Sequence, residues 1–390
     1  MGRLSRTNLM LLALTYWLYF GQLGVLVPYL GIFLDGRGFS SAEIGELFAV
    51  ITLARIIGPS LWAGIADKTG QALRILKFGC LLTVVCFSSV FYFHGFWGLT
   101  LSFGLMMMFW TAVLPQLEVI TMQSVAGSNV SYGQIRLWGS IGFIVLTIFV
   151  GKLLDVASSE APIYVSITVL SALFVSTLFL SSPVSVHRSD TSDTRIWLYL
   201  LTPVFIVFLL SAALLQVSFG AYYGFFALYM RDLSYTGQQT GLLIALGVLA
   251  EIGIFLVARR LIGRFGVRLL LLVCMLITAF RWHLLAEYAH LFWVVFVSQL
   301  FHALSFGLTH ATSVHFIHHF LPASFHSRGQ AIYISLAFGA GGAVGNYLAG
   351  QLWQQGEKAA LTFNVAAACA LAGALVLMLI GAKKMDARPA

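Results

Sequence analysis

Charged residues are scarce in this chain, at 9% of its 390 residues against 59% hydrophobic residues. Globular domains carry about a quarter charged residues, because their surfaces must face water. The mean hydropathy of +0.92 therefore excludes a soluble domain of ordinary composition. It predicts a polytopic membrane protein.

Motifs for catalysis or phosphate binding are also lacking: the sequence has no H-E-x-x-H, G-x-S-x-G or P-loop pattern. The few cysteines, Cys80, Cys86, Cys274 and Cys369, lie in apolar runs without paired or metal-like spacing. We therefore expect a protein that is not an enzyme and has no resident cofactor. No metal site is expected either, although the histidines of "HFIHH" at residues 315–319 leave metal ligation conceivable.

Long apolar runs dominate the sequence instead. A helix needs about 20 apolar residues to cross a bilayer, and twelve such segments are separated mostly by short polar loops. They are predicted at about residues 8–34, 43–66, 73–93, 96–122, 135–155, 161–181, 197–230, 238–262, 268–288, 291–321, 326–354 and 358–382. The first is too long for a signal-peptide core and is expected to be retained.

Basic residues concentrate in alternate loops when the N-terminus is placed inside. Only Arg37, Lys152, Arg231 and Lys358 fall in loops of the opposite side. The positive-inside rule thus predicts that both termini are cytoplasmic. The net charge of +8 then reflects topology and attraction to anionic lipid, and no nucleic-acid partner is expected.

A polar stretch at residues 182–195 divides the chain near its midpoint. It predicts a flexible cytoplasmic linker between six-helix bundles at 1–181 and 196–390. The turn "AGIADKTGQALR" after the second segment recurs as "RRLIGRFGVRLL" after the eighth. Lys68 matches Arg264 and Gly70 matches Gly266, which indicates a transporter built from two related halves.

The duplicated turn on twelve segments resembles the major facilitator superfamily, whose turn has the form G-x-L-A-D-R-x-G-R. The stretch "PQLEVITMQSVAGSNVSYGQIRLWGSIGF" is similar to lactose permease, and closer to the phenylpropionate-permease-like branch of bacterial symporters. "AYYGFFALY" and "LFHALSFGLTH" strengthen that second match. The resemblance implies an all-α membrane protein with twelve helices in two six-helix bundles. It also implies a conformational-switch turn, formed here by Asp67, Lys68, Gly70, Arg264 and Gly266.

Glu118 lies alone in an apolar run, where a charge at the bilayer centre costs roughly 2.5–3.5 kcal/mol. It precedes the turn near Gly127 by nine residues, and Arg136 follows that turn by nine. These positions lie at similar depth in an antiparallel helix pair, which predicts an ion pair. The resemblance to lactose permease implies a role in substrate recognition. A bridge that only joins two helices is the alternative.

Arg55 and Glu251 place opposite charges at equivalent positions of the two halves, at the same offset as the repeated turn. Arg55 precedes Asp67 by 12 residues, about 18 Å along a helix and beyond the reach of a snorkelling side chain. We expect Arg55 to bind substrate and Glu251 to approach Arg136.

The resemblance to lactose permease implies a proton-coupling region containing Arg281 and His302, to which we add His310. A neutral, hydrogen-bonded core histidine is the alternative for His302. Lactose permease has an acid one turn after this histidine, where the present chain has Ser305. Glu251 is therefore the expected proton carrier, because Glu118 has the clearer arginine partner.

The intramembrane charges predict the ligand class, since three arginines against two glutamates leave an excess positive charge that an anion would relieve. Phe143, Tyr222 and Tyr223 provide aromatic faces for a ring, although lactose permease has a tryptophan where Phe143 stands. We expect a proton-coupled symporter that imports a small organic solute, foremost an aromatic carboxylate, by alternating access. A sugar or nucleoside symporter is the alternative.

The predicted location is the bacterial inner membrane. The expected partners are the substrate, protons and membrane lipid, with the protein acting as a monomer.

Overall fold

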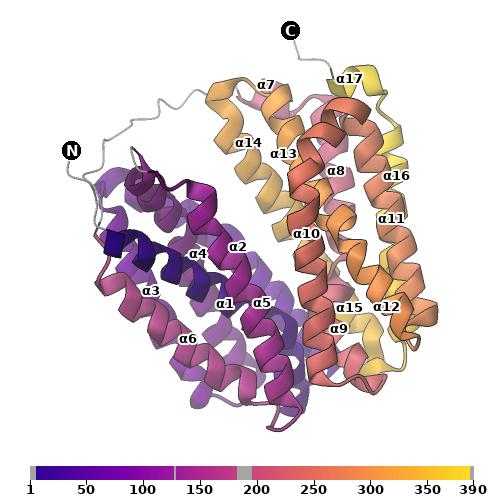
Figure 1. Ribbon diagram of the computed structural model, residues 1–390. Coiled ribbons are helices and arrows are strands. Elements are labelled where there is room, and N and C mark those ends of the chain that lie inside the picture. Colours follow the sequence, from indigo (N-terminus) through magenta and orange to yellow (C-terminus); the bar gives the residue numbers. More distant parts are fainter. Residues whose placement is uncertain (1–5, 127–128, 182–195, 387–390) are drawn as a thin grey trace. The chain divides into compact units, whose positions relative to one another are not determined.

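The computed structural model describes residues 6–126, 129–181 and 196–386, and every regular element in these ranges is helical (Figure 1). The predicted linker at 182–195 and the turn near Gly127 lie outside them. Eleven of the described helices are long and apolar enough to cross a membrane. The 29-residue α2 is not among the eleven, and the side chains of its residues 59–61, 63, 64 and 66–68 are not described. The predicted all-α membrane fold is confirmed.

Contacts divide the chain into two units. The first contains Met1–Phe39, Val50–Asp190 and Thr236–Gly241, and the second contains Ser40–Ala49, Thr191–Tyr235 and Leu242–Ala390. The elements up to the predicted linker are α1 (Arg6–Gly36), α2 (Ser41–Thr69), α3 (Ala72–Ser88), η1 (Ser89–Phe91), α4 (Phe96–Val125), α5 (Tyr132–Leu154) and α6 (Ala161–Leu178).

The elements after residue 195 include four π-helical or 3-10 segments, η2 to η5. In chain order the elements are α7 (Ile196–Leu200), α8 (Pro203–Ser218), α9 (Gly220–Asp232), α10 (Gly237–Phe265), α11 (Val267–Tyr288), α12 (Phe292–Leu300), η2 (Ala303–Leu308), α13 (Thr309–Phe320), η3 (Ala323–Phe325), α14 (His326–Tyr333), η4 (Ile334–Gly341), α15 (Gly342–Trp353), η5 (Gln354–Gly356), α16 (Ala359–Met378) and α17 (Ala382–Asp386).

The span predicted over 197–230 divides into the short α7 and one candidate span, Pro203–Asp232, which α8 and α9 form together. Pro203 opens α8, because proline has no N–H to continue the preceding helix but fits a first turn. Thr202 caps that turn by accepting a hydrogen bond from the Phe205 N–H at 3.4 Å. α9 then begins directly after Phe219 and carries Tyr222 and Tyr223.

Helices α1 and α5 pack closely in the first unit (Figure 1). A Cβ on Gly142 would overlap the Trp17 carbonyl, and one on Gly24 would lie 2.5 Å from the Phe143 carbonyl oxygen. These glycines let the two backbones approach, as small residues do in membrane helix pairs. The close approach brings the α1 aromatics to Arg136 on α5.

The tenth predicted span widens into the π-helix η2 immediately after His302. Such segments commonly occur at functional sites, because the extra residue in the turn changes where side chains point. Here the widened turn contains Ser305 and Phe306, both of which contribute to the site described below.

The repeated turn is visible in the backbone. Gly70 has φ of 63° and Gly266 has φ of 75°, a conformation that glycine adopts at little cost. The side chains of Asp67 and Lys68 lie outside the described residues, and Arg264 is exposed. A conformational-switch role for this turn therefore stays a prediction.

Candidate functional site

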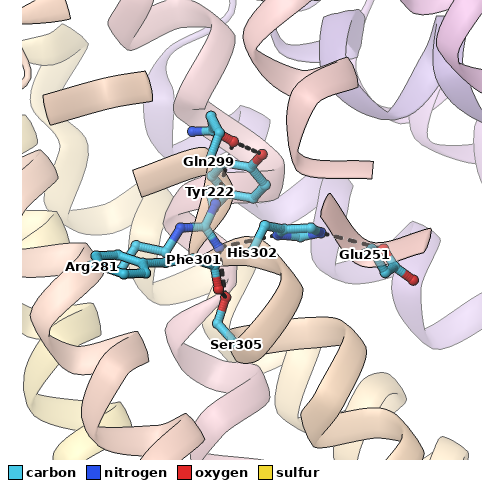
Figure 2. A network of polar contacts seen from close by, with 7 residues as sticks. All are labelled: Tyr222, Glu251, Arg281, Gln299, Phe301, His302 and Ser305. Carbon is cyan, nitrogen blue, oxygen red and sulfur yellow. Dashed lines mark hydrogen bonds and ion pairs between the residues drawn. The ribbon is translucent and has the colours of Figure 1, made fainter. Parts of the chain in front are cut away.

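Arg281 on α11 is fully buried, with 0% of its side chain exposed. Its Nη1 lies 3.1 Å from His302 Nδ1 and donates to Ser305 Oγ at 2.9 Å, and its Nη2 donates to Gln299 Oε1 at 3.5 Å (Figure 2). All three partners are neutral groups, with Gln299 on α12, Ser305 on η2 and His302 immediately before η2. The charge is thus solvated by dipoles, as burial requires.

Two aromatic faces complete the surroundings of Arg281. Its guanidinium carbon lies 4.6 Å from the Tyr222 ring centroid and 4.4 Å from that of Trp282. The Tyr222 hydroxyl donates to Gln299 Oε1 at 2.7 Å, so this amide oxygen accepts from both Tyr222 and Arg281. Cation–π contacts gain strength when both partners are desolvated. Tyr222 therefore helps to stabilise the buried charge of Arg281.

His302 lies between Arg281 and Glu251. A guanidinium can only donate, so His302 Nδ1 must accept, and the ring proton of the neutral histidine is on Nε2. Nε2 lies 3.7 Å from Glu251 Oε2 (Figure 2). Arg281 thereby selects the tautomer that presents an N–H to the Glu251 carboxylate.

His302 and His310 belong to one aromatic stack. Phe306 lies between them, with ring centroids 5.4 Å from His302 and 6.2 Å from His310 and nearly parallel planes. His310 also stacks on Tyr333 at 6.1 Å. The structure therefore joins His310 to His302 through a phenyl ring, which passes no proton.

Glu118 and Arg136 in the first unit have separate partners. Glu118 Oε1 accepts a hydrogen bond from the Tyr132 hydroxyl at 3.1 Å. The Arg136 guanidinium lies 3.7 Å from the Phe20 ring centroid and 5.8 Å from that of Tyr16. The described residues contain no ion pair between Glu118 and Arg136, because Tyr132 and Phe20 take their places.

An aromatic pair lies beside these charges. Tyr19 on α1 stacks on Trp110 of α4 with centroids 4.3 Å apart and planes inclined by 15°, and both are buried. The charged residues Arg55, Glu118 and Arg136 lie in the surroundings of Tyr19. Arg55 itself is exposed, while Glu118 and Arg136 are half-buried.

Two further predicted residues, Phe143 and Tyr223, lie in packing contacts. Phe143 is a half-buried side chain on α5, whose carbonyl packs on Gly24. Tyr223 stacks on Phe219 at 5.5 Å, in the second unit. The predicted approach of Glu251 to Arg136 joins residues of different units, and it stays a prediction.

Among the contributors that were not singled out from the sequence as binding or coupling residues are Tyr132, Gln299, Phe20 and Trp282. Tyr132 lies one turn before Arg136, and Gln299 lies one turn before His302, so both share a helix face with a predicted residue. That spacing is the signal that could have found them. Nothing comparable points to Phe20 or Trp282, since aromatic residues are common throughout this chain.

Comparisons with known proteins identify a family of membrane transporters. The model of the MFS_1 like family matches residues 9–365. The probable 3-phenylpropionic acid transporter of Escherichia coli (strain K12) is 28% identical over 350 residues, 88% of this chain and 90% of that protein. Maltose permease of Geobacillus stearothermophilus is 28% identical over 385 residues, 96% of this chain and 95% of that protein.

Among solved structures, the nucleoside transporter NupG superposes with a TM-score of 0.85. The match covers 95% of this chain and 98% of the other at 16% sequence identity. At that identity, the likeness concerns the fold alone.

Proposed function

This chain belongs to the MFS_1 like family of major facilitator transporters of small solutes, and on that premise we propose that it is a proton-coupled symporter importing an aromatic carboxylate. It would act as a monomer in the bacterial inner membrane with both termini in the cytoplasm. The two bundles would alternate in exposing the substrate site.

The observation that carries this proposal is the charge around the Tyr19–Trp110 stack. Phe20 links this stack to Arg136, because its ring centroid lies 5.0 Å from that of Tyr19 and 3.7 Å from the Arg136 guanidinium. Arg55 and Glu118 are the other charged residues near Tyr19, so two arginines face one glutamate. A ligand carboxylate would neutralise the excess, and a guanidinium binds it through two parallel hydrogen bonds. The stacked rings offer an aromatic wall for the ligand's ring.

The relative named as a probable 3-phenylpropionic acid transporter supports this substrate class, because that compound combines a ring with a carboxylate.

Proton coupling is assigned to the Arg281 cluster of the second unit. Glu251 is the carboxylate beside His302, and we propose that it takes and releases the proton. Arg281 would hold His302 neutral and oriented, because a proton on Nδ1 would face the guanidinium donor. His310 would extend the ring stack without carrying the proton.

A sugar or nucleoside symporter is the second candidate. Similarity to maltose permease over 96% of this chain favours it, and the Glu118–Tyr132 pair could accept and donate hydrogen bonds to hydroxyl groups. The two candidates differ in net charge movement. An anion carried with one proton is electroneutral, whereas a neutral sugar or nucleoside carried with one proton is electrogenic.

The test is uptake by purified protein in proteoliposomes, using labelled 3-phenylpropionate, maltose and a nucleoside. The proposal expects 3-phenylpropionate to enter in response to an alkaline interior, with a limiting accumulation of about tenfold per pH unit. A membrane potential imposed without a pH gradient should have little effect. Initial rates must be corrected with protein-free vesicles, because the neutral acid also crosses lipid.

Potential-driven accumulation of maltose or the nucleoside, with no protein-dependent entry of 3-phenylpropionate, would replace the first proposal with the second.

A further inference from the structure

Tyr132 and Arg136 compete for one carboxylate. They are four residues apart on α5 and therefore lie on the same face, one turn from each other. Glu118 on α4 faces them, and its Oε1 accepts from the Tyr132 hydroxyl at 3.1 Å. An arginine–carboxylate bond is ordinarily the stronger of the two options, so the observed choice needs a cause.

The cause lies in the α1 aromatics. Phe20 covers the Arg136 guanidinium at 3.7 Å, and Tyr16 lies over it at 5.8 Å. Gly139, one turn further along α5, makes room for this contact. A Cβ there would lie 2.6 Å from the Phe20 ring and 3.0 Å from Arg136 Nη1. The Arg136 guanidinium therefore packs on Phe20, while the Glu118 carboxylate is hydrogen-bonded to Tyr132.

The contact with Phe20 does not use the N–H donors of Arg136. A cation–π contact uses the face of the guanidinium, whereas its N–H donors point outward in its plane. In the described part of the chain, no carboxylate pairs with Arg136. The in-plane donors are therefore not committed to an acidic side chain of the described residues.

We propose that Tyr132 sets the charge class of the substrate by holding Glu118 away from Arg136, so that Arg136 can bind a ligand carboxylate. This rests on the proposed function, in which an aromatic acid is the substrate. It assigns Tyr132 as a positioning residue for specificity: it need not touch the ligand, and it acts through Arg136. Without its hydroxyl, Glu118 and Arg136 would pair and exclude an anion.

The first test needs no substrate. Phenylglyoxal modifies arginines that are free of ion pairs, and peptide mapping by mass spectrometry reports the modification of Arg136 in the intact protein. Tyr132→Phe should slow this modification about tenfold or more, the factor for one charged hydrogen bond. Tyr132→Phe combined with Glu118→Gln should restore the wild-type rate, because glutamine cannot form the ion pair.

Tyr164→Phe is the matched control. It removes a hydroxyl from an exposed tyrosine of α6 whose ring contacts Phe91 at a tilted angle, and it should leave the rate unchanged. An unchanged Arg136 rate in Tyr132→Phe would overturn the inference. So would a slowed rate that persists in the double variant, since that would indicate altered packing.

The second test measures binding of 3-phenylpropionate and of its neutral amide to the same proteins. Tyr132→Phe should weaken binding of the acid about tenfold or more and leave binding of the amide unchanged, and the double variant should recover binding of the acid. Equal weakening of both ligands would overturn the inference.

If Arg136 reactivity follows the expected pattern while the wild type does not bind 3-phenylpropionate, the proposed substrate is wrong. The control of Arg136 by Tyr132 would then still stand.

Discussion

Aromatic faces hold two of the three arginines that are predicted to lie within the membrane. Arg136 rests on Phe20 and Arg281 lies between Tyr222 and Trp282. At the end of α1, by contrast, Arg37 forms a two-bond ion pair with Glu160, at 2.7 and 3.0 Å. Burying an ion pair costs more desolvation than an aromatic contact, which leaves the donor edge intact. The aromatic contacts suit the proposed roles of these arginines, in which each interacts with another group during transport.

Arg55 gives the prediction that belongs to single residues. Arg55→Gln keeps hydrogen-bonding capacity but removes the charge that faces the proposed carboxylate. We expect binding of 3-phenylpropionate to weaken by about tenfold or more, the loss of a charged hydrogen bond, and binding of its amide to be unchanged. Titration of both ligands against the purified variant measures this. Equal losses of affinity for the acid and the amide would indicate that Arg55 only stabilises the fold.

At the scale of elements, the α1–α5 contact sets the geometry of the proposed binding residues. α1 supplies Tyr16, Tyr19 and Phe20, while α5 supplies Tyr132 and Arg136. The helices can approach because glycines face backbone atoms across the contact. A side chain at such a position forces the helices apart and shifts every residue of the site.

Gly142 and Gly104 offer a matched comparison of this effect. A Cβ on Gly142 would overlap the Trp17 carbonyl, whereas one on Gly104 would only touch Val50 at 3.9 Å. Alanine favours a helix over glycine by about 0.5–1 kcal/mol, while overpacking costs about 1–3 kcal/mol. Gly142→Ala should therefore lower the midpoint of thermal denaturation in detergent, and Gly104→Ala should leave it equal or higher. A Gly142→Ala protein as stable as wild type would contradict the close packing.

At the scale of the whole molecule, the proposed proton coupling can be tested only through the complete transport cycle. Glu251→Gln imitates the protonated carboxyl and cannot release the proton. We expect such a protein to exchange labelled for unlabelled 3-phenylpropionate across the membrane at near wild-type rates. It should fail to accumulate the substrate in response to a pH gradient, because return of the empty carrier requires deprotonation. Both assays are run on the same proteoliposomes.

Glu287→Gln is the control for that experiment. Glu287 is an exposed carboxylate on α11 that accepts a hydrogen bond from Asn364 at 2.7 Å, and its replacement should preserve both exchange and accumulation. If Glu251→Gln accumulated the substrate fully, Glu251 would not be the proton carrier, and His302 with Arg281 would be the next candidate.

Composition and periodicity determined the class of this protein and most of its helices. Hydrocarbon offers no partner for backbone N–H and C=O groups, so long apolar segments must be helical. The repeated turn could also be predicted from the sequence, because only glycine adopts the positive φ seen at Gly70 and Gly266 at little cost. The buried Arg281 and its neighbour His302 also followed from the sequence, through resemblance to a known transporter.

Only the tertiary structure decided which groups pair. Spacing about a turn gives the depth of Glu118 and Arg136, but residues one turn apart share that depth within about 6 Å. Tyr132 is therefore as well placed as Arg136 to reach Glu118, and sequence spacing cannot rank them. The ranking comes from Phe20, which reaches Arg136 because Gly139 leaves space between two helices remote in sequence. That contact depends on how α1 and α5 are rotated about their axes, which no local pattern specifies.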